Sequence, residues 1–219
     1  MNPVQLNLIS AVDAVCTALE NDILNLHFAP GEKITESVLS ERYGVSRNTV
    51  REAVAHLLSQ GYLTKIANKG VSVRKFTAAD VREIFHLRQM LELEAVRMIA
   101  AAGNSPSALV DVLQQLETFD RVQQWDDYVR LDIRFHAGLV AAANSPRLSK
   151  LYDTILNEVK LCIYQTRNFV TIPAGRDASH RQILDALQSQ EYDAAASLLR
   201  QHIEQVITRY CNGLEAMKQ

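Results

Sequence analysis

Apolar side chains recur at helical spacing through the first part of the chain, in three stretches separated by turn residues. Pro30-Gly31 ends the first stretch, and Gly44-Val45 makes a tight turn between the second and the third. Ser46 is a favourable N-cap for the third stretch. We expect three helices here, over residues 6–27, 35–43 and 46–61. The short turn between the last two predicts a helix-turn-helix.

The periodicity changes after Gly61, where residues 62–66 and 71–74 form two short β-prone runs. The segment between them, Ala67-Asn68-Lys69-Gly70, is rich in turn-forming residues. This pattern predicts a β-hairpin, or wing, directly after the helix-turn-helix.

A long helix is predicted to start at Thr77, because Thr77-x-x-Asp80 resembles a capping box, and to end near Gly103. Ser105-Pro106 and Ser145-Pro146 each place an N-cap before a proline at the first helical position. No strand pattern follows. Further helices are expected to start near residues 105, 124, 145, 176 and 191, with residues 171–175 as the least regular segment.

These elements predict a mainly α protein with two domains. Residues 1–75 are expected to form a winged helix-turn-helix domain, and residues 76–219 an all-α antiparallel helical bundle. With only 8 Gly and 5 Pro, the chain has few turn residues for a many-stranded sandwich or barrel. Its 47% hydrophobic and 22% charged residues are typical of a globular protein, which excludes wholesale disorder.

The formal net charge of -2 hides an uneven distribution. Between Arg42 and Lys75 the chain has seven basic residues and one acidic residue, Glu52, a local charge of +6. Residues 76–219 carry 15 basic and 18 acidic residues instead. This asymmetry predicts a small basic module that binds a polyanion and a larger acidic module with another role.

The three cysteines, Cys16, Cys162 and Cys211, lie far apart and show no CxxC spacing. Neither a disulfide framework nor a thiolate zinc site is therefore indicated, and we expect small buried or half-buried side chains. The longest apolar stretch, residues 137–143, is far shorter than the roughly 20 residues that span a bilayer. We expect no membrane association and a cytoplasmic location.

The third predicted helix combines a buried stripe with a separate polar sector. On a helical wheel, Arg47, Asn48 and Arg51 lie away from the apolar residues Val50, Ala53, Val54 and Leu57. Arg can bind guanine and Asn adenine in the major groove, each with two hydrogen bonds. The wing adds the basic residues Lys65, Lys69 and Arg74. Ordinary solvated arginines are the alternative, but the turn, the hairpin and the local charge all favour DNA binding.

These residues resemble the winged helix-turn-helix of GntR-family bacterial transcription regulators. The resembling runs are Pro30-Gly31-Glu32-Lys33-Ile34-Thr35-Glu36, Tyr43-Gly44-Val45-Ser46-Arg47-Asn48-Thr49-Val50-Arg51-Glu52-Ala53, Gly61-Tyr62-Leu63 and Lys69-Gly70-Val71. The resemblance implies a homodimer that binds double-stranded operator DNA and is associated with the bacterial nucleoid when bound. The predicted DNA-binding set is Lys33, Arg47, Asn48, Thr49, Arg51, Lys69 and Gly70. Some members carry an arginine where this chain has Ser37, which predicts a different operator.

A second group of residues has the chemistry of a metal site. Asp132 and His136 are four residues apart on a predicted helix, so both project from one face. His180 and His202 lie in two consecutive predicted helices, where a helical hairpin would bring both inward. One carboxylate and three imidazoles suit zinc, nickel, manganese or a similar divalent ion. By itself the pattern is weak, because such pairs arise often by chance and single histidines usually have structural roles.

Further runs resemble the effector domain of the FadR subgroup, the FCD fold. They are Leu87-Arg88-x-x-Leu91-Glu92, Asp132-x-x-Phe135-His136, Asn144-Ser145-Pro146-Arg147-Leu148, His180-Arg181-x-Ile183-Leu184-x-Ala186-Leu187 and His202-Ile203. The resemblance implies a divalent metal, zinc before nickel or manganese, held by the Asp132, His136, His180 and His202 set, and a carboxylate effector. It also implies that Arg88 faces the effector; a salt bridge between helices, to Glu92 or Glu94, is the alternative.

The sequence thus predicts a DNA-binding regulator, a repressor rather than an activator, whose helical domain binds a divalent metal and a small organic acid that modulates operator binding. A regulator that senses the metal directly is the first alternative. A metal-dependent enzyme is disfavoured, because the chain has no HExxH motif, no evident general base beside the ligands and no motif for a second substrate.

Overall fold

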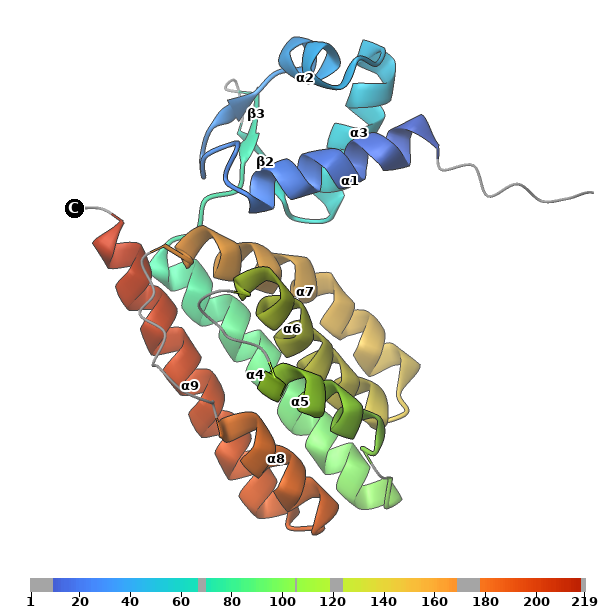
Figure 1. Cartoon of the computed structure of the whole chain (residues 1–219), viewed down its shortest axis with the longest axis vertical. Coiled ribbons are helices and arrows are strands. Elements are labelled where there is room, and N and C mark those ends of the chain that lie inside the picture. Colours follow the sequence, from blue (N-terminus) through green and yellow to red (C-terminus); the bar gives the residue numbers. More distant parts are fainter. Residues whose placement is uncertain (1–9, 67–69, 105, 119–123, 169–177, 218–219) are drawn as a thin grey trace, which may run out of the picture. The chain divides into compact units, whose positions relative to one another are not determined.

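A computed structural model describes residues 10–66, 70–104, 106–118, 124–168 and 178–217 (Figure 1). The chain divides into two compact units, residues 1–75 and residues 76–219. The fold is mainly helical with one small sheet, as predicted. Each unit is described by itself below.

The first unit is a helix-turn-helix with a small sheet beside it. In chain order its described elements are α1 (Ala11–Leu24), β1 (Lys33–Ile34), α2 (Glu36–Tyr43), α3 (Arg47–Ser59), β2 (Leu63–Ile66) and β3 (Gly70–Val73). The turn between α2 and α3 follows from its sequence, because Gly44 adopts the left-handed conformation with φ 66°. Ser46 then accepts a hydrogen bond from the Thr49 amide and caps α3, as expected.

The sheet contains one strand that the sequence pattern did not predict. Within the described residues its order is β1-β3-β2, and both pairings are antiparallel. Strand β1 pairs Lys33 with Ser72 and Ile34 with Val71. Two residues are too few to show the alternation that identifies a strand, so the sequence does not predict β1. The predicted hairpin turn, residues 67–69, lies outside the described residues, while Gly70 has φ 88°.

Several helix boundaries differ from the predictions. Helix α1 ends at Leu24 rather than near residue 27, because Leu26 adopts a left-handed backbone with φ 60°. Its predicted start, at residue 6, falls outside the described residues. Helix α5 starts at Ala108 rather than near 105; the predicted cap Ser105 and the irregular segment 171–175 are also outside the described part.

The second unit is an antiparallel bundle. The described part contains α4 (Ala78–Ala102), α5 (Ala108–Thr118), α6 (Trp125–Ala142), α7 (Pro146–Thr166), α8 (Ser179–Gln188) and α9 (Tyr192–Ala216). The capping box of Thr77 and Asp80 opens α4, and Ser145 caps α7, as the sequence predicted. Helix α8 starts three residues later than expected.

Helix α4 lies at the centre of this bundle and packs against α6, α7 and α9 (Figure 1). Helix α8 packs on α9, and α5 packs on α6 and α8. Most of the core is apolar, with Phe85, Phe135 and Ile183 fully buried. The helices that carry the four predicted metal ligands, α6, α8 and α9, therefore surround one interior.

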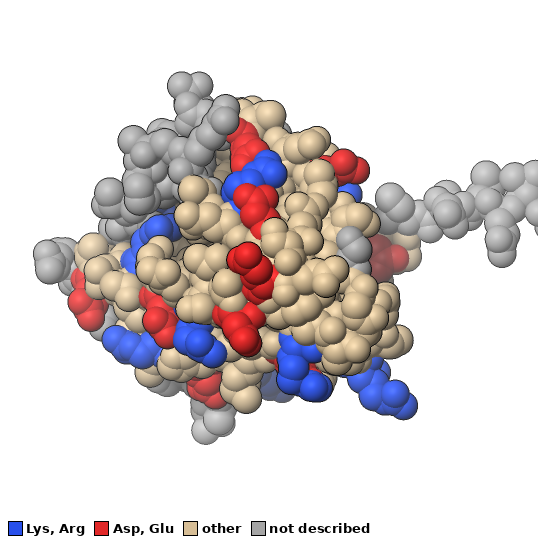
Figure 2. Space-filling model, turned by 90° about the horizontal axis from the view of Figure 1, so that it is seen from below, with Lys and Arg blue, Asp and Glu red and all other residues tan. Residues whose placement is uncertain are grey.

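The cysteines are free, with Cys162 and Cys211 buried and Cys16 half-buried, as predicted. None of the helices that the structure describes is long and apolar enough to cross a membrane. On the face shown in Figure 2, acidic and basic side chains are interspersed.

Candidate metal centre and DNA-binding surface

The structure brings the four predicted metal ligands together. Asp132 and His136 lie on α6, His180 on α8 and His202 on α9, and their donor atoms all lie within 4.8 Å of one another. The three histidines are buried, and the aspartate is half-buried. We call these residues the Asp–His cluster.

Hydrogen bonds turn the imidazole Nε2 atoms toward the cluster. The Nδ1 atom of His136 lies 2.7 Å from Glu92 Oε2, and that of His202 lies 2.9 Å from Ser179 Oγ. His180 Nε2 is 3.2 Å from His136 Nε2 and 3.1 Å from Asp132 Oδ1. These separations are close to the roughly 3 to 3.5 Å between two ligand atoms that are each about 2.1 Å from one metal ion.

The protonation states of the cluster also fit a metal ion. Burial lowers the pKa of His136 and lowers that of His202 well below its usual range, so both imidazoles stay neutral. Burial alone would raise the pKa of Asp132, but the hydrogen bond with His180 and the charge of Arg88 hold it well below its usual range. Neutral imidazoles and an ionised carboxylate are the metal-binding forms.

One atom of the cluster lacks a partner. His180 Nδ1 is buried and has no hydrogen-bond partner in the described part of the chain. A neutral imidazole carries one proton, so contacts of Nε2 with both His136 and Asp132 cannot satisfy the whole ring. The converging donor atoms of the four side chains fit a cation between them, whereas the second ring nitrogen of His180, Nδ1, stays outside these contacts.

Arg88 lies on α4 and is almost fully buried, as is its partner Glu92. Arg88 Nε donates to Glu92 Oε1 at 2.7 Å, so the alternative salt bridge predicted from the sequence does form. It lies within α4, four residues apart, and not between helices as we expected. Arg88 Nη2 remains buried without a partner among the described residues. Arg88 therefore forms an ion pair with Glu92 through Nε and keeps Nη2 as a hydrogen-bond donor without a partner among the described residues.

On the first unit, α3 presents the predicted recognition residues to solvent. Arg47, Asn48 and Arg51 are exposed. Arg51 donates two hydrogen bonds to Glu36 of α2, from Nε at 2.9 Å and Nη2 at 2.8 Å. Asn48 Nδ2 donates to Glu52 Oε1 at 3.0 Å. Both candidate base-reading side chains are thus held by carboxylates.

The remaining predicted DNA contacts are partly described. Lys33 is exposed on β1, and a Cβ atom added to Gly70 would lie 3.4 Å from Lys33 Cε, so the two residues are neighbours. Thr49 bonds to the Ser46 hydroxyl at 2.9 Å. Lys69 lies outside the described residues. Ser37 is exposed on α2, where some family members carry an arginine.

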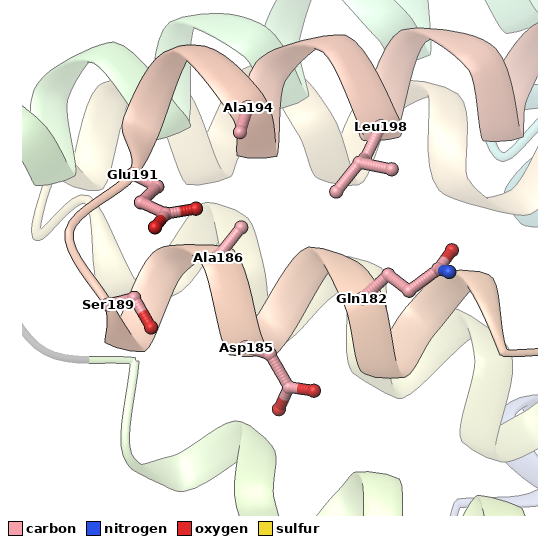
Figure 3. Close-up of a pocket in the computed structure, with 7 residues that line it drawn as sticks. All are labelled: Gln182, Asp185, Ala186, Ser189, Glu191, Ala194 and Leu198. Atoms are coloured by element: carbon pink, nitrogen blue, oxygen red, sulfur yellow. The ribbon is translucent and has the colours of Figure 1, made fainter.

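None of the four cluster residues lines a surface pocket of about 320 Å³, whose lining is drawn in Figure 3. It lies between α8 and α9 and is lined by Gln182, Asp185, Ala186, Ser189, Glu191, Ala194 and Leu198. Its carboxylates, Asp185 and Glu191, would repel an acidic ligand. This pocket is therefore unsuited to the predicted effector.

Sequence reasoning missed three contact residues. Glu92 was considered only as an alternative partner of Arg88, although its carboxylate also contacts His136 and accepts a 2.7 Å hydrogen bond from the Tyr152 hydroxyl. Glu36 was noticed within a motif but not as the partner of Arg51. A glutamate four residues after a buried arginine was the available signal for Glu92; no pattern pointed to Tyr152.

A winged helix-turn-helix followed by a helical bundle is the architecture of a class of DNA-binding regulators. Residues 11–73 match the model of the bacterial regulatory proteins of the gntR family, and residues 83–205 match the FCD domain. The chain belongs to the GntR family and carries an FCD domain. It is a DNA-binding transcriptional regulator and not an enzyme.

Named relatives agree with this assignment. The Nta operon transcriptional regulator of Aminobacter aminovorans is 28% identical, with 83% of this chain and 85% of that protein covered. The HTH-type transcriptional repressor RspR of Escherichia coli is also 28% identical, over 86% of this chain and 83% of the repressor. A crystal structure of a GntR-type regulator from Rhodococcus sp. RHA1 has a TM-score of 0.78 and 28% identity, covering 92% and 98% of the two chains.

Proposed function

We propose that the protein is a repressor whose helical unit binds a divalent metal, zinc before nickel or manganese, and a small carboxylate that modulates operator binding. The observation that supports this most is the Asp–His cluster, three buried imidazoles and a carboxylate with donor atoms within 4.8 Å. Arg88 Nη2 supplies a buried, unused donor for a carboxylate ligand. One of the named relatives, RspR, is a repressor.

The operator is read by α3 and the wing in this proposal. The exposed edge of Arg51 and the amide of Asn48 contact base edges, Arg47 and Thr49 contact the same groove, and Lys33, Lys69 and Gly70 contact the backbone. The +6 charge of residues 42–75 supplies the attraction to DNA.

The regulator acts as a homodimer in this proposal. Leu87 and Met90 on α4 and Leu151 on α7 are large apolar side chains that are 42%, 66% and 56% exposed. Helices α4 and α7 pack against each other, so these side chains are on neighbouring elements. Covering them with a second copy removes apolar surface from water. A Met90→Asp variant should then be monomeric in light scattering.

The metal is tested by elemental analysis of purified protein. We expect about one divalent ion per chain in the wild type and none in His202→Ala, because loss of one imidazole opens the site. His86→Ala is the matched control, since His86 is an exposed histidine on α4. Equal metal contents in the wild type and His202→Ala would refute the site.

The carboxylate is tested on the metal-loaded protein with lactate, malate, citrate and gluconate. A ligand at 100 times its Kd stabilises the folded protein by about 2.7 kcal/mol, which a thermal shift detects. An acid that stabilises the wild type should lose this effect in Arg88→Met. Operator affinity that responds to the metal alone, and to none of the acids, would favour the direct metal sensor instead.

A further inference from the structure

We infer that Glu92 is the positioning residue of the metal centre: it orients the His136 ring so that Nε2 faces the cation. This inference rests on the proposed metal function. It is carried by a network at one carboxylate, which contacts three side chains at 2.7 Å from three directions. The side chain is fully buried, so water does not compete for these contacts.

The first step concerns the tautomer of His136. Glu92 Oε1 accepts a hydrogen bond at 2.7 Å from Arg88 Nε, and because an arginine side chain stays charged in proteins, Glu92 is the carboxylate partner of a fixed positive charge. An ionised carboxylate only accepts hydrogen bonds. Nδ1 of His136 must therefore carry the proton at the 2.7 Å contact with Oε2, which leaves the lone pair on Nε2.

The contacts of the His136 ring also fix the direction in which Nε2 points. His136 Nε2 lies 3.2 Å from His180 Nε2, inside the Asp–His cluster. A ring held at Nδ1 and surrounded by Phe135 and the other two imidazoles, with ring centroids 5.2 to 5.4 Å apart, has little freedom to rotate. Fixing the second nitrogen of a ligand histidine raises its basicity and orients it toward the metal.

The third step concerns what holds Glu92. Its Oε1 atom accepts from Arg88 Nε and from the Tyr152 hydroxyl, while Oε2 is left for His136. Arg88 on α4 and Tyr152 on α7 thus fix the carboxylate, and the carboxylate fixes a ligand on α6. The network joins three helices at the metal centre.

The test compares zinc affinity in Glu92→Gln, by competition with a chromophoric chelator, with that of the wild type. The amide has the shape of the carboxylate but has only one acceptor oxygen and no charge. We expect a 10- to 100-fold weaker affinity, the usual effect of removing such a partner of a ligand histidine. Glu94→Gln is the matched control: Glu94 is on the same helix but forms an exposed ion pair with Arg97.

Cobalt(II) provides a readout that a purely structural role would not change. Its visible absorption reports ligand geometry, so we expect an altered spectrum in Glu92→Gln and a wild-type spectrum in Glu94→Gln. Glu92→Asp is the second variant, because it retains the charge opposite Arg88 but is too short to keep all three contacts. We expect it to fold and to bind zinc at least tenfold more weakly.

The outcomes separate the two proposals. A wild-type protein that binds no zinc would overturn the metal function itself, and this inference with it. A folded Glu92→Gln or Glu92→Asp protein with wild-type zinc affinity and cobalt spectrum would overturn only the role of Glu92.

Discussion

The two units each contain an arginine–glutamate pair of similar geometry in opposite surroundings. Arg51 and Glu36 meet at 2.8 Å on the surface that we propose binds DNA, where their side chains are 64% and 39% exposed. Arg88 and Glu92 meet at 2.7 Å inside the bundle, where the corresponding values are 2% and 0%. The same chemical contact therefore serves two different purposes.

The exposed pair can be exchanged at little cost, because water can replace either partner and DNA phosphates or bases can replace the glutamate. The buried pair is not, because either charge left alone would lack both water and a counter-charge. A binding residue on the first unit can thus change without affecting the fold. On the second unit, the residues around the cluster support folding and ligand binding at once.

The same substitution, arginine to methionine, can be made in the pair of each unit, and the largest effect is expected in the buried pair. Arg88→Met removes the counter-charge of buried Glu92, and we expect unfolding to become easier by about 3 to 5 kcal/mol. Urea denaturation followed by fluorescence of Trp125, the single tryptophan, measures this on the bundle. Arg97→Met, at an exposed pair of the same helix, is the control. Equal stability of the two variants would show that the buried pair has no special role.

Arg51→Met should show the reverse pattern. We expect the urea midpoint to remain unchanged, while affinity for an operator selected from random duplexes falls roughly 10- to 100-fold, the value of a two-bond contact to a base. A gel-shift titration measures the affinity, and Arg97→Met again serves as the control. Unchanged operator affinity would remove Arg51 from the recognition surface.

Acidification should lower the stability of the second unit before that of the first, with a smaller effect than the substitutions. Burial, together with His180 and His136, keeps the pKa of His202 well below its usual range. Above about pH 6.5 the histidine is neutral in both states; below it, only the unfolded chain takes up the proton. Stability should therefore fall by up to about 1.4 kcal/mol per pH unit for this residue.

The measurement is urea denaturation of metal-free protein at pH 7 and pH 5, with Trp125 fluorescence as the signal. His202→Phe should show a weaker dependence on pH. In the first unit, the pKa of Asp22 is lowered mainly by its hydrogen bond with Arg42, so that contribution is lost only below about pH 4. A bundle whose stability does not change between pH 7 and pH 5 would contradict the expectation.

Local signals in the sequence predicted much of this molecule. Ser46, Ser145 and the capping box of Thr77 mark helix starts through contacts with residues three positions away, which a sequence displays directly. Helical spacing and a helical hairpin indicated the convergence of the Asp–His cluster only weakly, and the resemblance to the FCD fold carried the prediction of all four ligands.

Contacts between distant segments were harder to predict. Strand β1 exists only through its pairing with β3, and Tyr152 reaches Glu92 from another helix. The Arg88 pair was expected between helices, although its spacing of four residues already allowed it within one. The end of α1 was missed because Leu26 adopts a backbone conformation that its residue type does not favour.

The pairing of Lys33 with Ser72 also bears on when the proposed DNA-binding surface is complete during synthesis. Helices α2 and α3 are adjacent in the chain and can meet as soon as both have been synthesised, whereas β1 must wait for β3. Contacts so distant in sequence form late, since a long loop must close first. A nascent chain on the ribosome should therefore acquire operator binding only after Val73 has emerged, so that incomplete regulators do not occupy the operator.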